Sequence, residues 1–156
     1  MSSSGSVVTI KRAAPASGRA KGTQPPAAGS AVVVVFAAVP DSQARIEGAI
    51  ARAKDLGGPL RVIVVQEVPT ALALDAPPVS NEFIIRKLLE VLAPSGVESK
   101  VEVLLCRDGR EAIRSALASP ALVVLVADGR GWLSRGMRLL RLLVRDGHCV
   151  ALLDGA

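Results

Sequence analysis

Aliphatic runs and amphipathic stretches alternate along the chain from residue 31 onwards. Each run of Val, Leu, Ile and Ala has the pattern of a buried strand. The five runs span 31–39, 60–68, 98–106, 121–127 and 148–154. Between them apolar residues recur near helical spacing, and the predicted helices span 42–56, 81–93, 108–118 and 132–146. This alternation predicts an α/β fold, a three-layer sandwich with a five-stranded parallel sheet and helices on both faces.

Polar residues and prolines mark the ends of these elements. Pro40 ends the first run, and either Asp41 or Ser42 can cap the helix that follows. Ser80 can cap the second helix, after a proline-containing loop that crosses one end of the sheet. The third helix begins with a capping box, Asp108-Gly109-Arg110-Glu111. The first half of the third run alternates polar and apolar residues, so we expect that strand at a sheet edge with one side in water.

The first 30 residues differ from the rest in composition. They are rich in Ser, Ala, Gly and Pro, contain no acid, and carry four positive charges at Lys11, Arg12, Arg19 and Lys21. Such a segment buries too little apolar surface to offset the entropy of ordering, so 1–30 is expected to be a flexible basic arm and 31–156 the folded domain. Its short apolar piece, VVTIK, could form a strand if a partner supplied an edge.

Charge and aromatic content bear on the class of partner. The full chain has a net charge of +5, but residues 31–156 hold 15 basic and 14 acidic side chains, so the excess belongs mainly to the arm. With no Tyr, one Trp and two Phe, the domain lacks an aromatic stacking platform, and nucleic acid is not an expected partner.

Cysteine use and the length of the apolar runs bear on location. Cys106 and Cys149 lie in or beside predicted strands without Cys-x-x-Cys spacing, which favours buried free thiols, although spacing alone does not decide a disulfide. The runs are shorter than the roughly 20 residues that cross a bilayer, and the Ser- and Gly-rich start does not resemble a secretory signal. A cytoplasmic protein is expected, with docking on a membrane complex as a further expectation.

A glycine-rich turn follows the fourth run, in VADGRGW. If the first strand is central, strands one and four flank the point where strand order reverses, which is where ligands bind in such folds. The amides of Gly129, Arg130 and Gly131 can form an anion-binding nest at the start of the last helix, with Ser134 nearby. Alternatively, the glycines only allow a tight turn.

Three segments together resemble the universal stress protein family over residues 31–154. They are AAVPDSQARIEGAIARAKDLGGPLRVIVV, VEVLLCRDGREAI and ALVVLVADGRGW with the closing HCVALL. The resemblance implies strand order 3-2-1-4-5 and pairing of two copies through the last strand. In the family's ATP-binding branch an Asp ends strand one and a Gly-x-x-Gly, nine residues, Gly-Ser/Thr loop wraps the phosphates.

The nucleotide site that the resemblance implies is incomplete here. Pro40 stands at the position of the Asp, and Asp41 is displaced by one residue. Gly129 and Gly131 have Gly-x-Gly spacing, no Gly-Ser or Gly-Thr follows, and the interval to Cys149 is about four residues short of the family pattern. No cofactor is therefore expected, whereas an ATP- or AMP-binding regulator with a shortened loop is the alternative.

The last predicted helix has two dissimilar faces. Its apolar face is expected to hold Leu133, Met137, Leu140, Leu143 and Val144. The opposite face holds Arg135, Arg138, Arg141 and Arg145. This basic face is either solvated or a docking surface for an acidic protein, a phosphate-bearing ligand or anionic lipid headgroups.

Candidate catalytic residues are few. The single histidine, His148, begins the last strand, without a nucleophile–base–orienter set or a metal-ligand cluster around it in the sequence. Neither Gly-x-Gly-x-x-Gly nor the Walker lysine pattern occurs. We therefore expect a non-enzymatic interaction or accessory subunit, which docks on a larger acidic partner through the arm and the arginine-rich helix.

Overall fold

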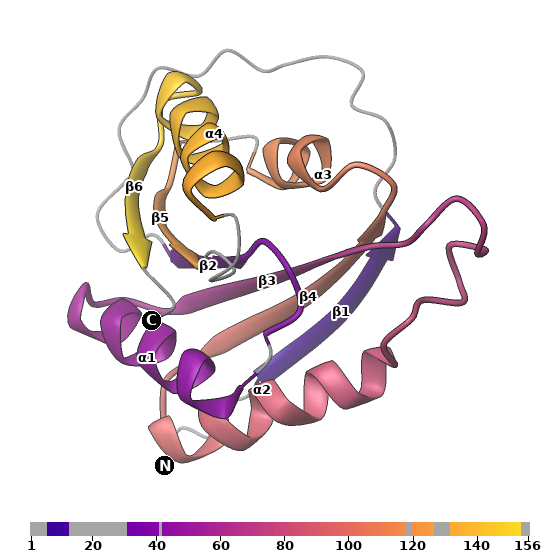
Figure 1. Ribbon diagram of the computed structural model, residues 1–156. Helices are drawn as coiled ribbons and strands as arrows, with labels where there is room; N and C mark the ends of the chain where they lie inside the picture. Colours follow the sequence, from indigo (N-terminus) through magenta and orange to yellow (C-terminus); the bar gives the residue numbers. More distant parts are fainter. Residues whose placement is uncertain (1–5, 13–30, 41, 118–119, 127–131, 154–156) are drawn as a thin grey trace.

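The computed structural model in Figure 1 describes residues 6–12, 31–40, 42–117, 120–126 and 132–153, with only the backbone described for 6–12 and 132–135. The strands are β1 (Ser6–Arg12), β2 (Val32–Phe36), β3 (Leu60–Glu67), β4 (Ser99–Cys106), β5 (Leu122–Val126) and β6 (Cys149–Leu153). The helices are α1 (Gln43–Asp55), α2 (Asn81–Ser95), α3 (Gly109–Ala116) and α4 (Trp132–Arg145).

All described strands pair in parallel in one sheet of order β1-β4-β3-β2-β5-β6. The five strands expected from the sequence are β2 to β6, and their order is 3-2-1-4-5 as expected. The central strand β2 pairs with β3 on one side and with β5 on the other. Strand order therefore reverses between β2 and β5, which is where a ligand site is expected in such a sheet.

Helices cover both faces of the sheet, which explains why the central strands are apolar throughout (Figure 1). Val32, Val34 and Phe36 of β2 pack in the core on the α1 and α2 side. The intervening Val33 and Val35 pack in the second core, together with residues of α3 and α4. Successive side chains of a strand point to opposite faces, so each residue of β2 is buried.

Strand β1 adds a sixth strand to the sheet, at a segment where the sequence allowed a strand only on a partner's edge. It runs parallel to β4, with Ser6 opposite Ser99 and Arg12 opposite Leu105. The expectation of an edge position for the third predicted strand is wrong, because β4 lies between β1 and β3 and its residues other than Lys100 are buried. The VVTIK segment therefore pairs with a strand of its own chain rather than with a partner. Residues 1–5 and 13–30 lie outside the described residues, and the flexible arm over 1–30 stays a prediction.

Short-range hydrogen bonds fix the helix ends. The amide of Arg45 donates to Ser42 Oγ at 3.3 Å, so Ser42 caps α1, whereas Asp41 lies outside the described residues. Ser80 precedes α2 but its side chain makes no capping bond, contrary to expectation. Helix α2 also extends past residue 93, its predicted end. The φ to which a proline ring is restricted is compatible with a helical turn, so Pro94 does not stop the helix. The helix ends at Gly96, whose φ of 69° is left-handed.

Helix α4 is rotated relative to the expected amphipathic pattern. Leu139 and Leu143 are buried, Leu140 is partly buried, and Val144 is 54% exposed. The buried positions, starting at Gly136, have the i, i+3, i+4, i+7 spacing of one helix face. Placing Val144 on the buried face was wrong, because it lies about 100° around the helix from Leu143.

Candidate functional site

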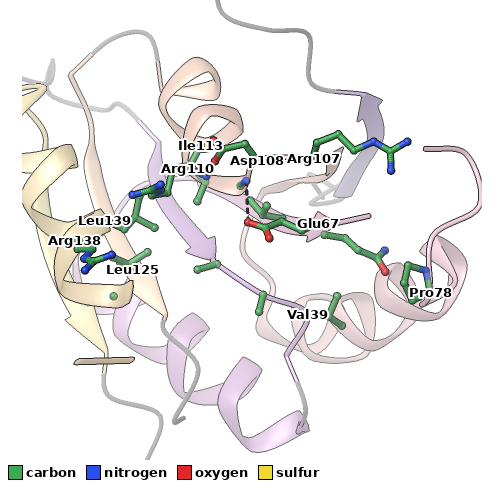
Figure 2. Close-up of a pocket in the computed structure, with 16 residues that line it drawn as sticks. Val39, Glu67, Pro78, Arg107, Asp108, Arg110, Ile113, Leu125, Arg138 and Leu139 are labelled. Carbon is green, nitrogen blue, oxygen red and sulfur yellow. Dashed lines mark hydrogen bonds between the residues drawn. The ribbon is translucent and has the colours of Figure 1, made fainter. Parts of the chain in front are cut away.

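A cleft of about 730 Å³ lies at the carboxyl ends of the central strands (Figure 2). Its walls come from the residues that follow β2 and β4, the ends of β3 and β5, and α3 and α4. The cleft therefore lies at the reversal of strand order between β2 and β5, and its volume is in the range of small-molecule sites.

Aliphatic core side chains, each at most 4% exposed, lie behind the cleft surface. They include Val65 of β3, Leu125 of β5, Ile113 of α3 and Leu139 of α4. Val65, Ile113, Leu125 and Leu139 also belong to the hydrophobic core on the α3 and α4 side, so their positions are fixed by packing. The cleft thus has an apolar lining held by the fold itself.

Two carboxylates of the protein cap the start of α3. Asp108 accepts hydrogen bonds from the amides of Arg110 (3.1 Å) and Glu111 (3.5 Å), which confirms it as the helix cap. Glu67, at the end of β3, accepts from the Gly109 amide at 3.0 Å (Figure 2). The helix amides that could hold a bound anion are therefore already occupied by side chains of the chain.

Burial and these carboxylates keep the nearby thiol protonated. Burial, with smaller contributions from Glu67 and Asp108, raises the pKa of Cys106 to about 11. Its Sγ donates to the Gln66 carbonyl at 3.8 Å. Because the thiolate is the nucleophilic form of cysteine, Cys106 is unsuited to covalent chemistry at neutral pH.

The loop between β3 and α2 is attached to the cleft by two side chains. The buried amide of Gln66 donates to the Val79 carbonyl (3.1 Å) and accepts from the Val79 amide (2.9 Å). Arg107 donates to the carbonyls of Val68 and Pro69, at 3.0 and 2.6 Å. In Figure 2 Arg107 extends away from Arg110 and Arg138. Its guanidinium therefore positions the loop.

Arg110 and Arg138 are the two lining arginines whose guanidinium groups make no hydrogen bond or ion pair to the described residues. Arg110 lies in the first turn of α3 and Arg138 in α4, and both are exposed. Figure 2 shows both on the same side of the cleft, near Leu139. Two guanidinium groups on different helices thus face the same cavity.

The predicted nucleotide-site residues fall largely outside the described part of the chain. This applies to Asp41, Gly129, Arg130 and Gly131. Ser134 lies in the first turn of α4, and only its backbone is described. Whether these residues meet in one site stays a prediction.

The predicted partner-binding residues fall on two elements and one undescribed segment. Lys11 and Arg12 lie in β1, and Arg135 lies near the start of α4. Arg138, Arg141 and Arg145 are exposed along α4. Arg19 and Lys21 lie outside the described residues.

His148 is packed into the start of β6 and is only 5% exposed. Its Nδ1 accepts a hydrogen bond from the Ala121 amide at 3.1 Å. Burial lowers the pKa of the imidazole, while the charge of Asp146 partly opposes that shift. The hydrogen bond and the burial of His148 therefore hold the start of β6 in place.

The two cysteines are free, and the structure separates them. Cys106 is buried in β4 as expected, whereas the expectation of a buried thiol is wrong for Cys149, which is exposed in β6. Four strand steps separate β4 from β6, which corresponds to about 19 Å. A disulfide needs Cα atoms roughly 4–7 Å apart, so the two cannot pair within this sheet.

Sequence reasoning missed Gln66, Glu67 and the unpaired guanidinium of Arg110. A signal was present, because polar residues directly follow aliphatic runs in VIVVQE and VLLCRDGR. Polar residues at the carboxyl ends of parallel strands gather at one edge of the sheet. Glu67 and Gly109 are 42 residues apart in the chain, so their contact could be predicted only from the order of the strands in the sheet.

The strand order and helix placement define the class of this protein as a Rossmann-like α/β fold with a parallel sheet. No protein-family model matches the chain, and neither a curated protein nor a solved structure is significantly similar to it. No described helix is long and apolar enough to cross a membrane. Among the described residues, no three His, Cys, Asp or Glu side chains are grouped to hold a metal ion.

Proposed function

We propose that this protein is a non-enzymatic accessory subunit, similar to universal stress proteins, that docks on an acidic protein partner in the cytoplasm or at a membrane complex. The carrying observation is the exposed arginine row of α4, formed by Arg138, Arg141 and Arg145. None of the three makes an ion pair with a described residue. The order of the strands agrees with the resemblance to universal stress proteins. This agreement supports the fold, whereas the docking role rests on the arginine row.

Two other arginines of the same sheet face, Arg61 and Arg114, are neutralised within the chain. Arg114 binds Asp146 through two hydrogen bonds of 2.8 and 3.0 Å. Arg61 binds the buried carboxylate of Glu102 at 2.8 Å. Against this background, three neighbouring positive charges on α4 that have no counterion in the described part of the chain form a surface suited to an acidic partner.

An exposed apolar side chain lies on the same face of α4. Val144 is 54% exposed and falls between Arg141 and Arg145 along the helix. An apolar group flanked by arginines favours a protein over a free ion, because burying Val144 adds an apolar contact that water or a free ion cannot supply. The basic residues Lys11, Arg12, Arg19 and Lys21 are assigned to the same interaction.

The test is recovery of the tagged full-length protein from its own cells, comparing two variants of equal charge. Arg141→Gln/Arg145→Gln removes two charges of the row, and Arg52→Gln/Arg86→Gln removes two exposed charges from α1 and α2 on the opposite face of the sheet. The proposal predicts that the first pair loses a specific acidic partner and the second retains it. Equal retention by both variants would exclude the α4 row as the docking surface.

The cleft favours a second candidate function, an ATP- or AMP-binding regulator. In this function Asp41, Gly129, Arg130, Gly131 and Ser134 hold the nucleotide. A ligand that binds only the native state raises its stability by mass action. ATP at 100 times its dissociation constant is expected to add about 2.7 kcal/mol, and Gly131→Val should abolish the effect. An unchanged melting temperature with millimolar ATP and AMP would exclude this candidate.

Pairing of two copies through β6 is a further proposal on oligomeric state. Among the described strands β6 has a neighbour on one side only, so its outer edge presents unpaired backbone groups. Light scattering of the purified protein gives the molar mass directly. A molar mass equal to that of the monomer at micromolar concentration would contradict the proposed homodimer.

A further inference from the structure

We infer that the cleft binds a small organic anion with an apolar body, and that Arg110 and Arg138 pair with its anionic group. This inference goes beyond the docking proposal and does not depend on it. It also assigns the anion to side chains of α3 and α4 rather than to the glycine turn. Arg110 and Arg138 are the arginines of the cleft whose guanidinium groups have no partner among the described residues.

The other charged groups of the cleft are engaged with the protein's own backbone. Glu67 and Asp108 accept from the first amides of α3, whose positive end offsets part of their charge. Arg107 donates to two loop carbonyls. Only Arg110 and Arg138, among the described lining residues, keep all guanidinium donors available.

The geometry allows both guanidinium groups to act on one ligand. Arg110 comes from the first turn of α3 and Arg138 from the middle of α4, and both line the same cavity (Figure 2). A guanidinium presents a planar set of donors that pairs with two oxygens of a phosphate or carboxylate. Two of them, facing one cavity and without a counterion among the described residues, define an anion-binding position at its edge.

The rest of the lining selects the body of the ligand. The accessible apolar part comes from Ala37, Ala38, Val39 and Pro78, whose side chains carry no hydrogen-bonding group. Inorganic phosphate would leave this surface unused, and a neutral apolar compound would leave both arginines unpaired. The cavity of about 730 Å³ has room for a ring system that carries one anionic group.

The test uses naphthyl phosphate as the probe, with naphthol and inorganic phosphate as its two halves. Isothermal titration calorimetry on the full-length protein is expected to show naphthyl phosphate binding at least about tenfold more tightly than either half, since charge pairing and apolar burial add. Arg110→Gln and Arg138→Gln should each weaken binding by about tenfold. Both side chains are exposed, so melting temperatures close to that of the parent are expected and serve as the folding check.

Arg141→Gln is the matched control, because Arg141 is exposed on α4, three residues beyond Arg138, and does not line the cleft. Its affinity for naphthyl phosphate should stay within about twofold of the parent, as for a surface charge outside the site. Absence of binding, equal affinity for naphthol, or equal weakening by Arg141→Gln and Arg110→Gln would each overturn the inference. If only the docking proposal is wrong, Arg141→Gln/Arg145→Gln retains the acidic partner as well as Arg52→Gln/Arg86→Gln does, while naphthyl phosphate still binds to the parent protein.

Discussion

Gly109 begins α3 at the point where the Glu67 carboxylate reaches the helix amides. A Cβ added at Gly109 would lie 2.7 Å from Glu67 Oε1 and 3.2 Å from Val65 Cγ1. The carboxylate would have to move away, and the hydrogen bond to the Gly109 amide would be lost. At this residue the glycine is required by a close approach rather than by a turn.

Gly109→Ala is therefore expected to destabilise the fold by about 1 kcal/mol, the usual net value of one hydrogen bond. In the Glu67→Ala background the same substitution should cost much less, because the oxygen it displaces is gone. Gly48→Ala is the control: no atom lies within 4 Å of its added Cβ, and alanine in a helix interior adds up to about 1 kcal/mol. Urea unfolding of the four variants measures these differences; equal costs of Gly109→Ala in both backgrounds would contradict the role of Glu67.

His148 predicts a pH dependence of stability. Because burial lowers its pKa in the folded state, the unfolded chain takes up the proton first as pH falls below about 6.5. The free energy of unfolding should therefore fall with pH from about 6.5 down to the folded-state pKa, by at most about 1.4 kcal/mol per pH unit, and be independent of this residue above that window. In His148→Asn, whose amide oxygen can still accept from Ala121, this part of the slope should vanish; an unchanged slope between pH 7.5 and 5.5 would show that His148 does not cause it.

At the scale of elements, local signals in the sequence predicted the aliphatic strands and the helices that alternate with them. Asp108 was identified as a cap, and Ser42 as one of two candidates beside Asp41, because capping is set by a few neighbouring residues. The phase of α4 was predicted wrongly because several leucines in a row fit two faces, and only the packing against the sheet distinguishes Leu139 from Val144. Strand β1 was expected only on an edge supplied by a partner, because its actual neighbour, β4, is some 90 residues away and a segment with three apolar residues does not specify that pairing.

The observed phase of α4 is tested by a pair of substitutions at adjacent residues. Leu143→Ala removes a side chain that is 0% exposed and should cost about 2–5 kcal/mol. Val144→Ala, at an exposed position, should change stability by about 0.5 kcal/mol or less. Thermal unfolding measures both costs. Because Leu143 lies on the expected face as well as on the observed one, a cost of Val144→Ala similar to that of Leu143→Ala would restore the face expected from the sequence.

Pairing of β1 with β4 also makes a prediction at this scale. Deleting residues 1–12 should leave the other five strands folded, since the buried residues described for both cores lie between 32 and 143. Backbone amides of β4 that donate to β1 should then exchange with solvent faster, while those of the central β2 stay protected. Hydrogen exchange by mass spectrometry measures both; unchanged protection of β4 would mean that β1 contributes no stable pairing.

At the scale of the whole molecule, the two faces of the sheet differ in what they offer to a partner. The α3 and α4 side combines the cleft, the unpaired arginines and exposed Val144, whereas α1 and α2 cover the other face. The sequence placed the arginines on one helix face, because their spacing is local. It could not show which arginines are neutralised, since Arg61 and Arg114 find their acids 41 and 32 residues away.

The most direct test of the docking proposal is photo-crosslinking in living cells from single positions of the folded protein. A benzophenone amino acid at Val144, within the arginine row, is compared with the same residue at Glu47, which is exposed on α1. The docking function predicts a discrete crosslinked product with an acidic protein from position 144 and none from position 47. The absence of a product from position 144, or the same product from both positions, would contradict it.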